Sequence, residues 1–204
     1  MVETAAIAPP NALNHQKMTP KAYLEMERKG IREFDGKYEL FNQTLIFMAG
    51  ASEAHNKIAG HILTILNNLI WEHDLDASVS QSDMRVVSFV KHKNYFYPDI
   101  VFTLGENKFD DRRKDVLVNP TLLVEVLSDE TEGFDRNGKF ESYKKIESLK
   151  EYILVSQYER HVEHFYKNDA GEWITGEALT NGELSLYSIP FSLPLKMIYY
   201  RMPF

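Results

Sequence analysis

The sequence predicts a domain in the α/β to α+β range, in which a mixed β-sheet carries helices on its faces. Three observations predict this class. Residues 121–127, 135–149 and 151–156 read as strand, helix and strand, the pattern of a parallel β-α-β unit. Residues 52–74 have the periodicity of a long amphipathic helix. The remaining apolar segments alternate with polar residues and are separated by turn residues, which is typical of hairpins.

The N-terminal segment differs in composition from the rest of the chain. Residues 1–17 are rich in Ala, Pro and Asn and lack periodicity, so we expect a disordered or loosely docked arm. Residues 18–204 are then a single domain. It opens with a short helix that is capped by Thr19 and ends at Gly30.

A hairpin and a long helix follow. Alternating residues in 37–50 predict two short strands that turn at Asn42 and Gln43. Ser52 is a suitable cap for the helix over 52–74. The apolar residues of this helix recur at helical spacing: Ile58, Ile62, Ile65, Leu66 and Leu69.

The second half of the chain is mainly strands and turns, with one further helix. The segments expected in order are residues 77–90, a turn at 91–94, a strand over 95–104, a charged loop over 105–120, the β-α-β unit, and three short strands after residue 159.

Two of the predicted strands carry a carboxylate inside an apolar run. Asp99 precedes Ile-Val-Phe, and Glu125 lies within Leu-Leu-Val-Glu-Val-Leu. A buried ionised carboxylate must be paired, protonated or bound to a metal. Two such groups at adjacent strand ends make the oxygen site that Mg²⁺ or Mn²⁺ prefers. Residue type and burial favour equally the alternative that each carboxylate is paired separately with a Lys or Arg.

Composition excludes several classes of protein. The chain has no cysteine, which excludes disulfides and zinc-thiolate sites. We expect no signal peptide and no membrane span, and therefore a cytoplasmic protein. The net charge of −7 argues against a surface that binds nucleic acid non-specifically.

Six fragments, in order, carry a resemblance to a known family. They are Tyr-Glu-Leu from Tyr38, the histidine-bearing helix, Pro-Asp at Asp99, Glu-Val-Leu-Ser from Glu125, Asp-Arg-x-x-Lys-x-x-x-Tyr from Asp135, and Glu-Tyr-x-x-Val from Glu151. The chain resembles, over residues 20–190, the putative restriction endonuclease family of the PD-(D/E)XK nuclease superfamily. The resemblance implies a restriction-endonuclease-like core and a Mg²⁺- or Mn²⁺-dependent nuclease that acts on DNA.

The resemblance also implies roles for individual residues. Asp99 and Glu125 match the two acidic positions and would hold the metal together with the backbone carbonyl of Val126. The superfamily's lysine is replaced by Leu127, and Lys139 would supply the missing cation.

Three further side chains are accessory candidates. Glu39 matches an acidic position of the family, with an exposed hairpin residue as the equal alternative. Tyr143 lies four residues after Lys139 and hence on the same helical face. His55 would line the mouth of the site unless it is an ordinary surface histidine.

Other functions remain open at this point. The acidic charge and the lysine missing at Leu127 favour an inactive nuclease fold that serves as a binding or interaction module. An unrelated enzyme using the carboxylates as acid and base is a third hypothesis. For a nuclease we expect a homodimer, because two sites related by a two-fold axis cut both strands of a duplex most simply.

Overall fold

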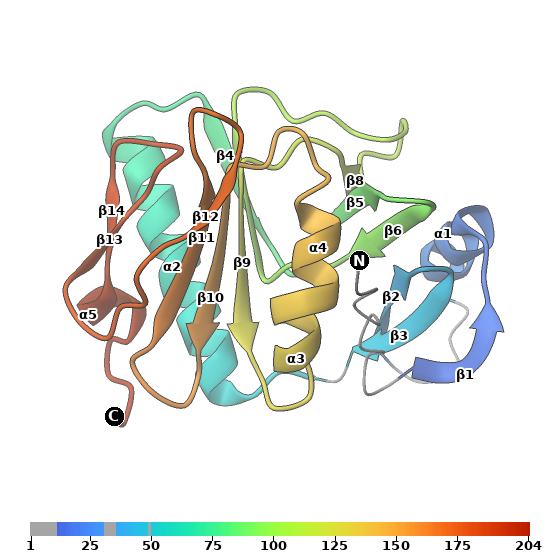
Figure 1. Cartoon of the computed structure of the whole chain (residues 1–204), viewed down its shortest axis with the longest axis horizontal. Helices are drawn as coiled ribbons and strands as arrows, with labels where there is room; N and C mark the ends of the chain where they lie inside the picture. Colours follow the sequence, from blue (N-terminus) through green and yellow to red (C-terminus); the bar gives the residue numbers. More distant parts are fainter. Residues whose placement is uncertain (1–11, 31–35, 49) are drawn as a thin grey trace.

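The computed structural model describes residues 12–30, 36–48 and 50–204, and it arranges them as two six-stranded sheets with helices between and around them (Figure 1). The helices are α1 (Pro20–Lys29), α2 (Glu53–Glu72), α3 (Glu132–Phe134), α4 (Phe140–Tyr143) and α5 (Leu195–Ile198), with a π-helical turn, η1 (Asp135–Lys139), joining α3 to α4. None of the helices in these ranges combines the length and the apolar character that a membrane crossing requires.

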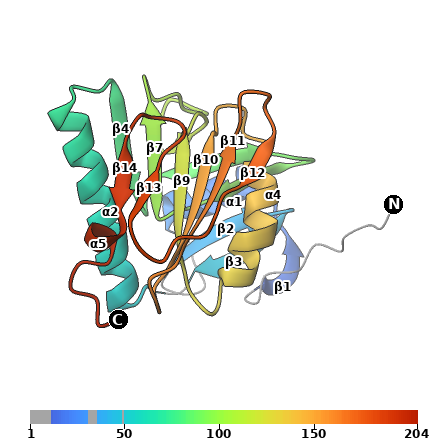
Figure 2. The ribbon, with the colours of Figure 1, turned by 60° about the vertical axis from the view of Figure 1, so that its left-hand side comes forward.

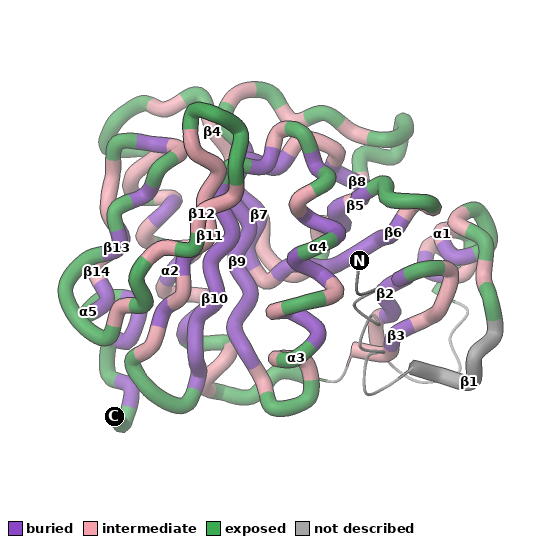
Figure 3. The backbone as a smooth tube through the Cα atoms, viewed as in Figure 1, coloured by how far each residue is buried: buried purple, intermediate pink, exposed green. Residues whose placement is uncertain are grey.

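The central sheet contains the β-α-β unit. Its strands, in spatial order, are β12 (Trp173–Thr175), β11 (Val162–Lys167), β10 (Glu151–Ser156), β9 (Leu122–Leu127), β7 (Ile100–Leu104) and β4 (Ala77–Gln81). Strands β9 and β10 are parallel and the other neighbours antiparallel. The predicted parallel pair is therefore confirmed, and both of its strands are buried along their whole length (Figure 3).

The second sheet lies beside the first. Its order is β1 (Ala12–Lys17), β3 (Thr44–Met48), β2 (Lys37–Phe41), β6 (Lys93–Phe96), β5 (Arg85–Phe89) and β8 (Val116–Leu117). Strands β2 and β3 form the predicted hairpin, and both turn residues, Asn42 and Gln43, have positive φ as a tight two-residue hairpin requires. A small separate sheet pairs β13 (Glu183–Ser185) with β14 (Ser192–Pro194).

Helices cover both faces of the central sheet, as the turned view shows most clearly (Figure 2). Alternation along β9 sends Leu122, Val124 and Val126 into a core with α2. Leu123 and Leu127 point the other way, into a core with α3, α4 and the second sheet. A third, smaller core lies between the second sheet and α1. The second sheet therefore has the α3–α4 layer on one face and α1 on the other.

The helix caps agree with the sequence. The Thr19 hydroxyl accepts a hydrogen bond from the Ala22 amide, and Gly30 ends α1 in a left-handed conformation with φ of 65°. The Ser52 hydroxyl accepts from the His55 amide at the start of α2. Short polar side chains satisfy the free amides of a first helical turn, which is why these starts could be located.

Three segments differ from expectation. Residues 12–17 of the expected arm form strand β1, which pairs with β3; residues 1–11 lie outside the described residues. The expected strand region 77–90 splits into β4 and β5, which belong to different sheets. The expected turn at 91–94 is shorter, because β6 begins at Lys93.

The second helix, expected over residues 135–149, begins earlier and ends sooner, at Tyr143. Its π-helical turn is packed so closely that a Cβ atom on Gly138 would lie 2.5 Å from the Phe134 ring. Any other residue at this position would force the Phe134 ring to move. Single π-helical turns occur frequently at functional sites, and this one carries Asp135 and Lys139.

Candidate active site

Strand register brings Asp99 and Glu125 together. In the antiparallel pair β7–β9, Ile100 lies opposite Val124 and Val101 opposite Leu123, so one further step places Asp99 opposite Glu125. Both carboxylates have the parity of Val101 and Leu123, whose side chains face α3 and α4. They therefore point to the same side of the sheet, at the end where β9 leads into α3.

Asp99 is held by one backbone amide and one histidine. Its Oδ2 atom accepts a hydrogen bond of 2.7 Å from the Val126 amide and lies 3.1 Å from Nε2 of His55. Burial alone would lower the pKa of His55, but its hydrogen bond to Asp99 and the charge of Asp99 outweigh that effect and the pKa is raised. His55 is therefore no free surface histidine, and it fixes Asp99 from the first turn of α2.

Glu125 lies deeper, with 3% of its surface exposed. Its Oε1 atom accepts from the Tyr143 hydroxyl at 2.9 Å and from Nζ of Lys139 at 3.2 Å. Burial raises the pKa of Glu125 well above its usual range, even though the charge of Lys139 opposes the shift. Lys139 and Tyr143, which lie on one face of the second helix, thus both contact Glu125.

Lys139 lies at the centre of a group that we call the site cluster, which comprises Lys139, Glu39, Glu125 and Asp135. Its Nζ atom is 3.0 Å from Oε1 of Glu39, and 3.2 Å from both Oε1 of Glu125 and Oδ1 of Asp135. Burial disfavours the charged lysine, but three carboxylates outweigh it and raise the pKa of Lys139 well above its usual value. Burial also raises the pKa of Glu39 and of Asp135.

Two members of the site cluster correct the sequence analysis. The reading of Glu39 as an exposed hairpin residue is wrong, because Glu39 is 1% exposed and also accepts the Tyr97 amide at 2.9 Å. Asp135, the first residue of the helix expected over 135–149, was not among the candidate site residues, and the structure places it in the cluster. The available signal was its spacing of four residues from Lys139, which puts both on one helical face.

The other candidate positions lie as follows. Val126 borders the cleft, and its amide is the one that binds Asp99. Leu127 is 3% exposed and packs in the core on the α3–α4 side, so it brings no charge to the site. Arg136, which precedes Lys139 by one helical turn, pairs instead with Glu132 and Glu163.

A cleft of about 630 Å³ opens onto these groups. Asp99, Glu125 and Lys139 form part of its wall. The lysine and carboxylate side chains that line the cleft are mainly acidic. There are two lysines, Lys37 and Lys139, and five carboxylates: Asp99, Glu125, Asp129, Glu130 and Asp135. Within the described ranges, no three His, Asp or Glu side chains are already gathered as a metal would require them.

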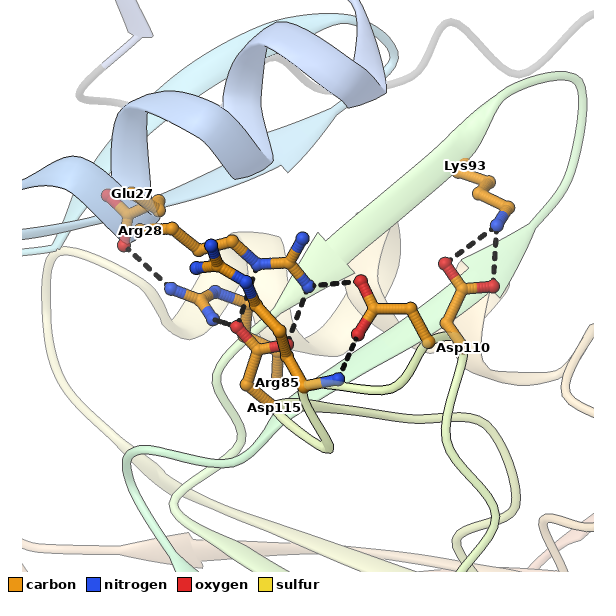
Figure 4. Close-up of polar contacts among 8 residues, drawn as sticks. Glu27, Arg28, Arg85, Lys93, Asp110 and Asp115 are labelled. Atoms are coloured by element: carbon orange, nitrogen blue, oxygen red, sulfur yellow. Dashed lines mark hydrogen bonds and ion pairs between the residues drawn. The ribbon is translucent and has the colours of Figure 1, made fainter.

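A second, partly buried charge group lies on the α1 side of the second sheet, and we call it the α1 network (Figure 4). It comprises Glu27, Arg28, Arg85, Asp111 and Asp115. Arg28 contacts Asp115 through two nitrogens, at 2.9 and 2.6 Å, and Asp111 at 2.6 Å. Arg85 contacts Asp115 at 3.0 Å and Glu27 at 3.4 Å. The hydrogen bond from Arg28 lowers the pKa of Asp115, which is opposite to the shifts in the site cluster.

Comparison with known proteins identifies the family and the fold. Residues 20–196 match the model of the family Uma2, described as "Putative restriction endonuclease". The chain belongs to this family. The resemblance identified from the six sequence fragments is thereby confirmed. Two relatives from Synechocystis sp. (strain ATCC 27184 / PCC 6803 / Kazusa) bear the names "Uncharacterized protein sll1609" and "Uncharacterized protein slr1290".

The relatives are similar over most of their length. The first is 34% identical over 162 residues, which cover 79% of this chain and 88% of the relative. The second is 32% identical over 188 residues, or 92% and 94% of the two chains. A crystal structure of a putative nuclease belonging to DUF820, from Anabaena variabilis ATCC 29413, superposes with a TM-score of 0.70 at 15% identity, covering 89% of this chain and 97% of that one. It confirms the predicted fold class of mixed sheets with flanking helices.

Proposed function

We propose that this Uma2 family member is a metal-dependent endonuclease that hydrolyses phosphodiester bonds of DNA. The observation that carries the proposal is the pair Asp99 and Glu125, opposite each other on neighbouring strands at the wall of a cleft. Family membership supports the same class of activity. The proposed cofactor is Mg²⁺ or Mn²⁺.

The donor set fits such an ion. Asp99, Glu125 and the backbone carbonyl of Val126 would hold it through oxygen atoms, the ligands that both ions prefer. Mg²⁺ is commonly bound by one or two protein carboxylates, while water and substrate phosphates complete its shell. A preformed group of three side chains is therefore not required. When bound, the ion polarises the scissile phosphate and lowers the pKa of a water molecule.

The electrostatics of the site cluster support the same proposal. Three buried carboxylates share one ammonium, and the pKa of each carboxyl is raised. Burial is the main cause of these shifts, and with one ammonium among three carboxylates a further positive charge would offset the repulsion between the carboxylates. This imbalance distinguishes the site from a structural ion pair that is already neutralised.

The surrounding side chains then have definite tasks. Lys139, whose pKa is raised, stays protonated and cannot serve as a base; it offsets negative charge that develops on the phosphate. The Tyr143 hydroxyl fixes one oxygen of Glu125, and His55 fixes one oxygen of Asp99. Glu39 and Asp135 hold Lys139 in place and act as positioning residues.

Plasmid nicking tests the proposal. We expect the wild type to nick supercoiled DNA with Mg²⁺ or Mn²⁺ and to stop when EDTA is added. Asp99→Asn should abolish nicking, and Lys139→Met should slow it about 10²-fold or more, because it removes a stabiliser of the transition state. Lys144→Met is the matched control, since Lys144 contacts Glu141 on the outer surface of the same helix, and it should nick as the wild type does.

The inactive binding module remains the second candidate, and one observation favours it. The position of the superfamily's lysine is taken by Leu127, which is buried among apolar side chains. Wild-type protein that fails to nick any DNA with either ion would move the assignment to this module. Nicking that survives Asp99→Asn would instead place the chemistry elsewhere.

A further inference from the structure

Of the two lysines among the described residues that line the cleft, Lys37 is the one that is held loosely. Its Nζ atom contacts a single carboxylate, that of Asp83, whose side chain is 86% exposed. Lys139, in contrast, is buried among three carboxylates. An ion pair with a well-solvated partner is screened by water and contributes little to stability. Lys37 can therefore exchange Asp83 for another anion at little cost, which the enclosed Lys139 cannot.

Lys37 is connected to the strand end that carries Asp99. Its ammonium donates a hydrogen bond of 2.9 Å to the Ser82 carbonyl. The Ser82 amide in turn donates to the Asp99 carbonyl at 3.1 Å, just beyond the end of the β4–β7 pair. The Tyr97 ring supports the same side chain, with its centroid 5.3 Å from Nζ. Both Lys37 and Asp99 line the cleft, so the ammonium is held beside the proposed metal site.

The Lys37 ammonium retains a hydrogen-bond donor for a ligand. A protonated lysine has three N–H donors on a flexible four-carbon stem. Within the described ranges, the oxygen atoms that engage these donors are the Ser82 carbonyl and one carboxylate oxygen of Asp83. A phosphate oxygen can therefore be bound first through the third donor, and then through the donor that Asp83 releases.

A polyanionic substrate in this acidic cleft needs such a cation. Much of the affinity of proteins for DNA comes from Lys and Arg that neutralise backbone phosphates. A metal ion at Asp99 and Glu125 would offset only part of the negative charge of the cleft, which five carboxylates line. Since Lys139 is already committed to three of them, Lys37 is the lysine of the described cleft that remains for the substrate.

We propose that Lys37 binds a backbone phosphate of the DNA strand in the cleft, and that its ammonium exchanges Asp83 for a phosphate oxygen when the substrate binds. This inference rests on the proposed nuclease function, because it names a residue that holds the substrate of that function. Asp83 then competes with the substrate for Lys37. The contact is made in the ground state and in the transition state alike, so its loss raises KM and leaves kcat nearly unchanged.

The test is a double-mutant cycle on the pair of Lys37 and Asp83. Fluorescence anisotropy with a labelled DNA duplex, titrated at a series of salt concentrations in Ca²⁺, measures binding by Lys37→Gln, Asp83→Asn and the double variant. The matched control cycle uses Lys57→Gln and Glu53→Gln, because these residues form an exposed ion pair in the first turn of α2 and do not line the cleft. Thermal melting followed by circular dichroism verifies that each variant is folded.

We expect Lys37→Gln to bind about tenfold more weakly and to reduce the slope of log K against log salt by about one. Asp83→Asn should bind about threefold more tightly than the wild type, because it frees Lys37 from its partner. In the Lys37→Gln background, Asp83→Asn should have no more effect than Glu53→Gln has in the wild type. Lys37→Arg keeps the positive charge and should bind within about threefold of the wild type.

Equal weakening by Lys37→Gln and Lys57→Gln, or none by either, would overturn the inference. Tightening by Asp83→Asn that is the same with and without Lys37 would also overturn it. If Lys37→Gln does not fold, Asp83→Asn decides against Glu53→Gln: greater tightening supports the exchange, and equal tightening overturns it.

Plasmid nicking by the wild type separates this inference from the nuclease proposal. Nicking together with binding that does not depend on Lys37 overturns the inference and leaves the nuclease proposal standing. Binding that depends on Lys37 without nicking supports the phosphate contact and moves the assignment to the inactive binding module. Wild type that binds no duplex overturns the inference.

Discussion

The site cluster and the α1 network lie on opposite faces of the second sheet; both combine cations with carboxylates, but they differ in charge balance and in burial. In the α1 network two arginines pair with three carboxylates. Hydrogen bonds from guanidinium and amide donors lower the pKa of Asp111 and Asp115. In the site cluster one lysine pairs with three carboxylates, and burial raises the pKa of each carboxyl group. The α1 network is closer to charge balance. The site cluster is short of positive charge, which is what a cation-binding site requires.

Tyr97 connects the two groups. Its amide donates to Glu39 in the site cluster, and its hydroxyl donates to Oε2 of Glu27 in the α1 network at 2.8 Å. The Arg85 guanidinium lies over the same ring, 4.9 Å from its centroid. The α1 network thereby supports the strand end that carries Pro98 and Asp99. The comparison predicts that mutations in the network reduce stability, whereas those in the cluster reduce function.

The largest expected effect on stability is that of Arg85→Met. Arg85 is 7% exposed, and its loss leaves Glu27, itself 4% exposed, without that cation. Removing one partner of a buried ion pair typically costs about 3–5 kcal/mol. Urea unfolding followed by circular dichroism measures the effect. A loss below about 1 kcal/mol would show that the network does not stabilise the fold.

Lys139→Met should have an effect on stability that depends on pH. Without the ammonium, the three carboxyl groups bind protons more tightly in the folded state than in the unfolded state. Stability is then greatest at low pH and decreases as pH rises through the raised pKa values. We expect Lys139→Met to lose about 1–2 kcal/mol more than the wild type between pH 5 and pH 8. Parallel curves of melting temperature against pH for the two proteins would contradict the assigned charges.

Asp115→Asn provides the opposite pH dependence. The pKa of Asp115 is lowered on folding, so its stabilisation is present above the unfolded pKa and is lost as pH falls through the folded pKa. The variant should therefore be less stable than the wild type at neutral pH, and the difference should shrink in acid. Thermal melts at pH 7 and pH 3 check this, and a difference that grows in acid would contradict it.

Glu125→Gln should have the smallest effect on stability. The amide oxygen can still accept from Tyr143 and Lys139, while one of three mutually repelling charges is removed. We expect the free energy of unfolding to stay within about 1 kcal/mol of the wild type or to rise. The same urea titration measures it. A loss similar to that of Arg85→Met would mean that the two groups are equally structural.

Local signals predicted much of the fold. Thr19, Ser52 and Gly30 mark helix ends through their own hydrogen bonds and backbone conformation, and Asn42-Gln43 marks a hairpin. Asp99 and Glu125 could be identified as candidate site residues because a buried carboxylate within an apolar run must be paired, protonated or bound to a metal. All of these depend on neighbours in sequence.

The remainder depends on contacts between distant segments. Glu39 is buried only because α3, η1 and α4 pack over its strand, and nothing near residue 39 indicates that cover. The π-helical turn that aligns Asp135 with Lys139 depends on how Phe134 packs against Gly138. The division of residues 77–90 between two sheets likewise follows from tertiary pairing, since alternation is the same in either sheet.

The central claim is that Asp99 and Glu125 form a cation site in a cluster short of positive charge, and Mn²⁺ titration calorimetry tests it most directly. We predict that the wild type binds Mn²⁺ at one site and that Asp99→Asn and Glu125→Gln lose it. Asp129→Asn, which removes a carboxylate from the same cleft without touching the pair, should retain it. Absence of Mn²⁺ binding to the wild type, or equal affinity in all four proteins, would contradict the claim.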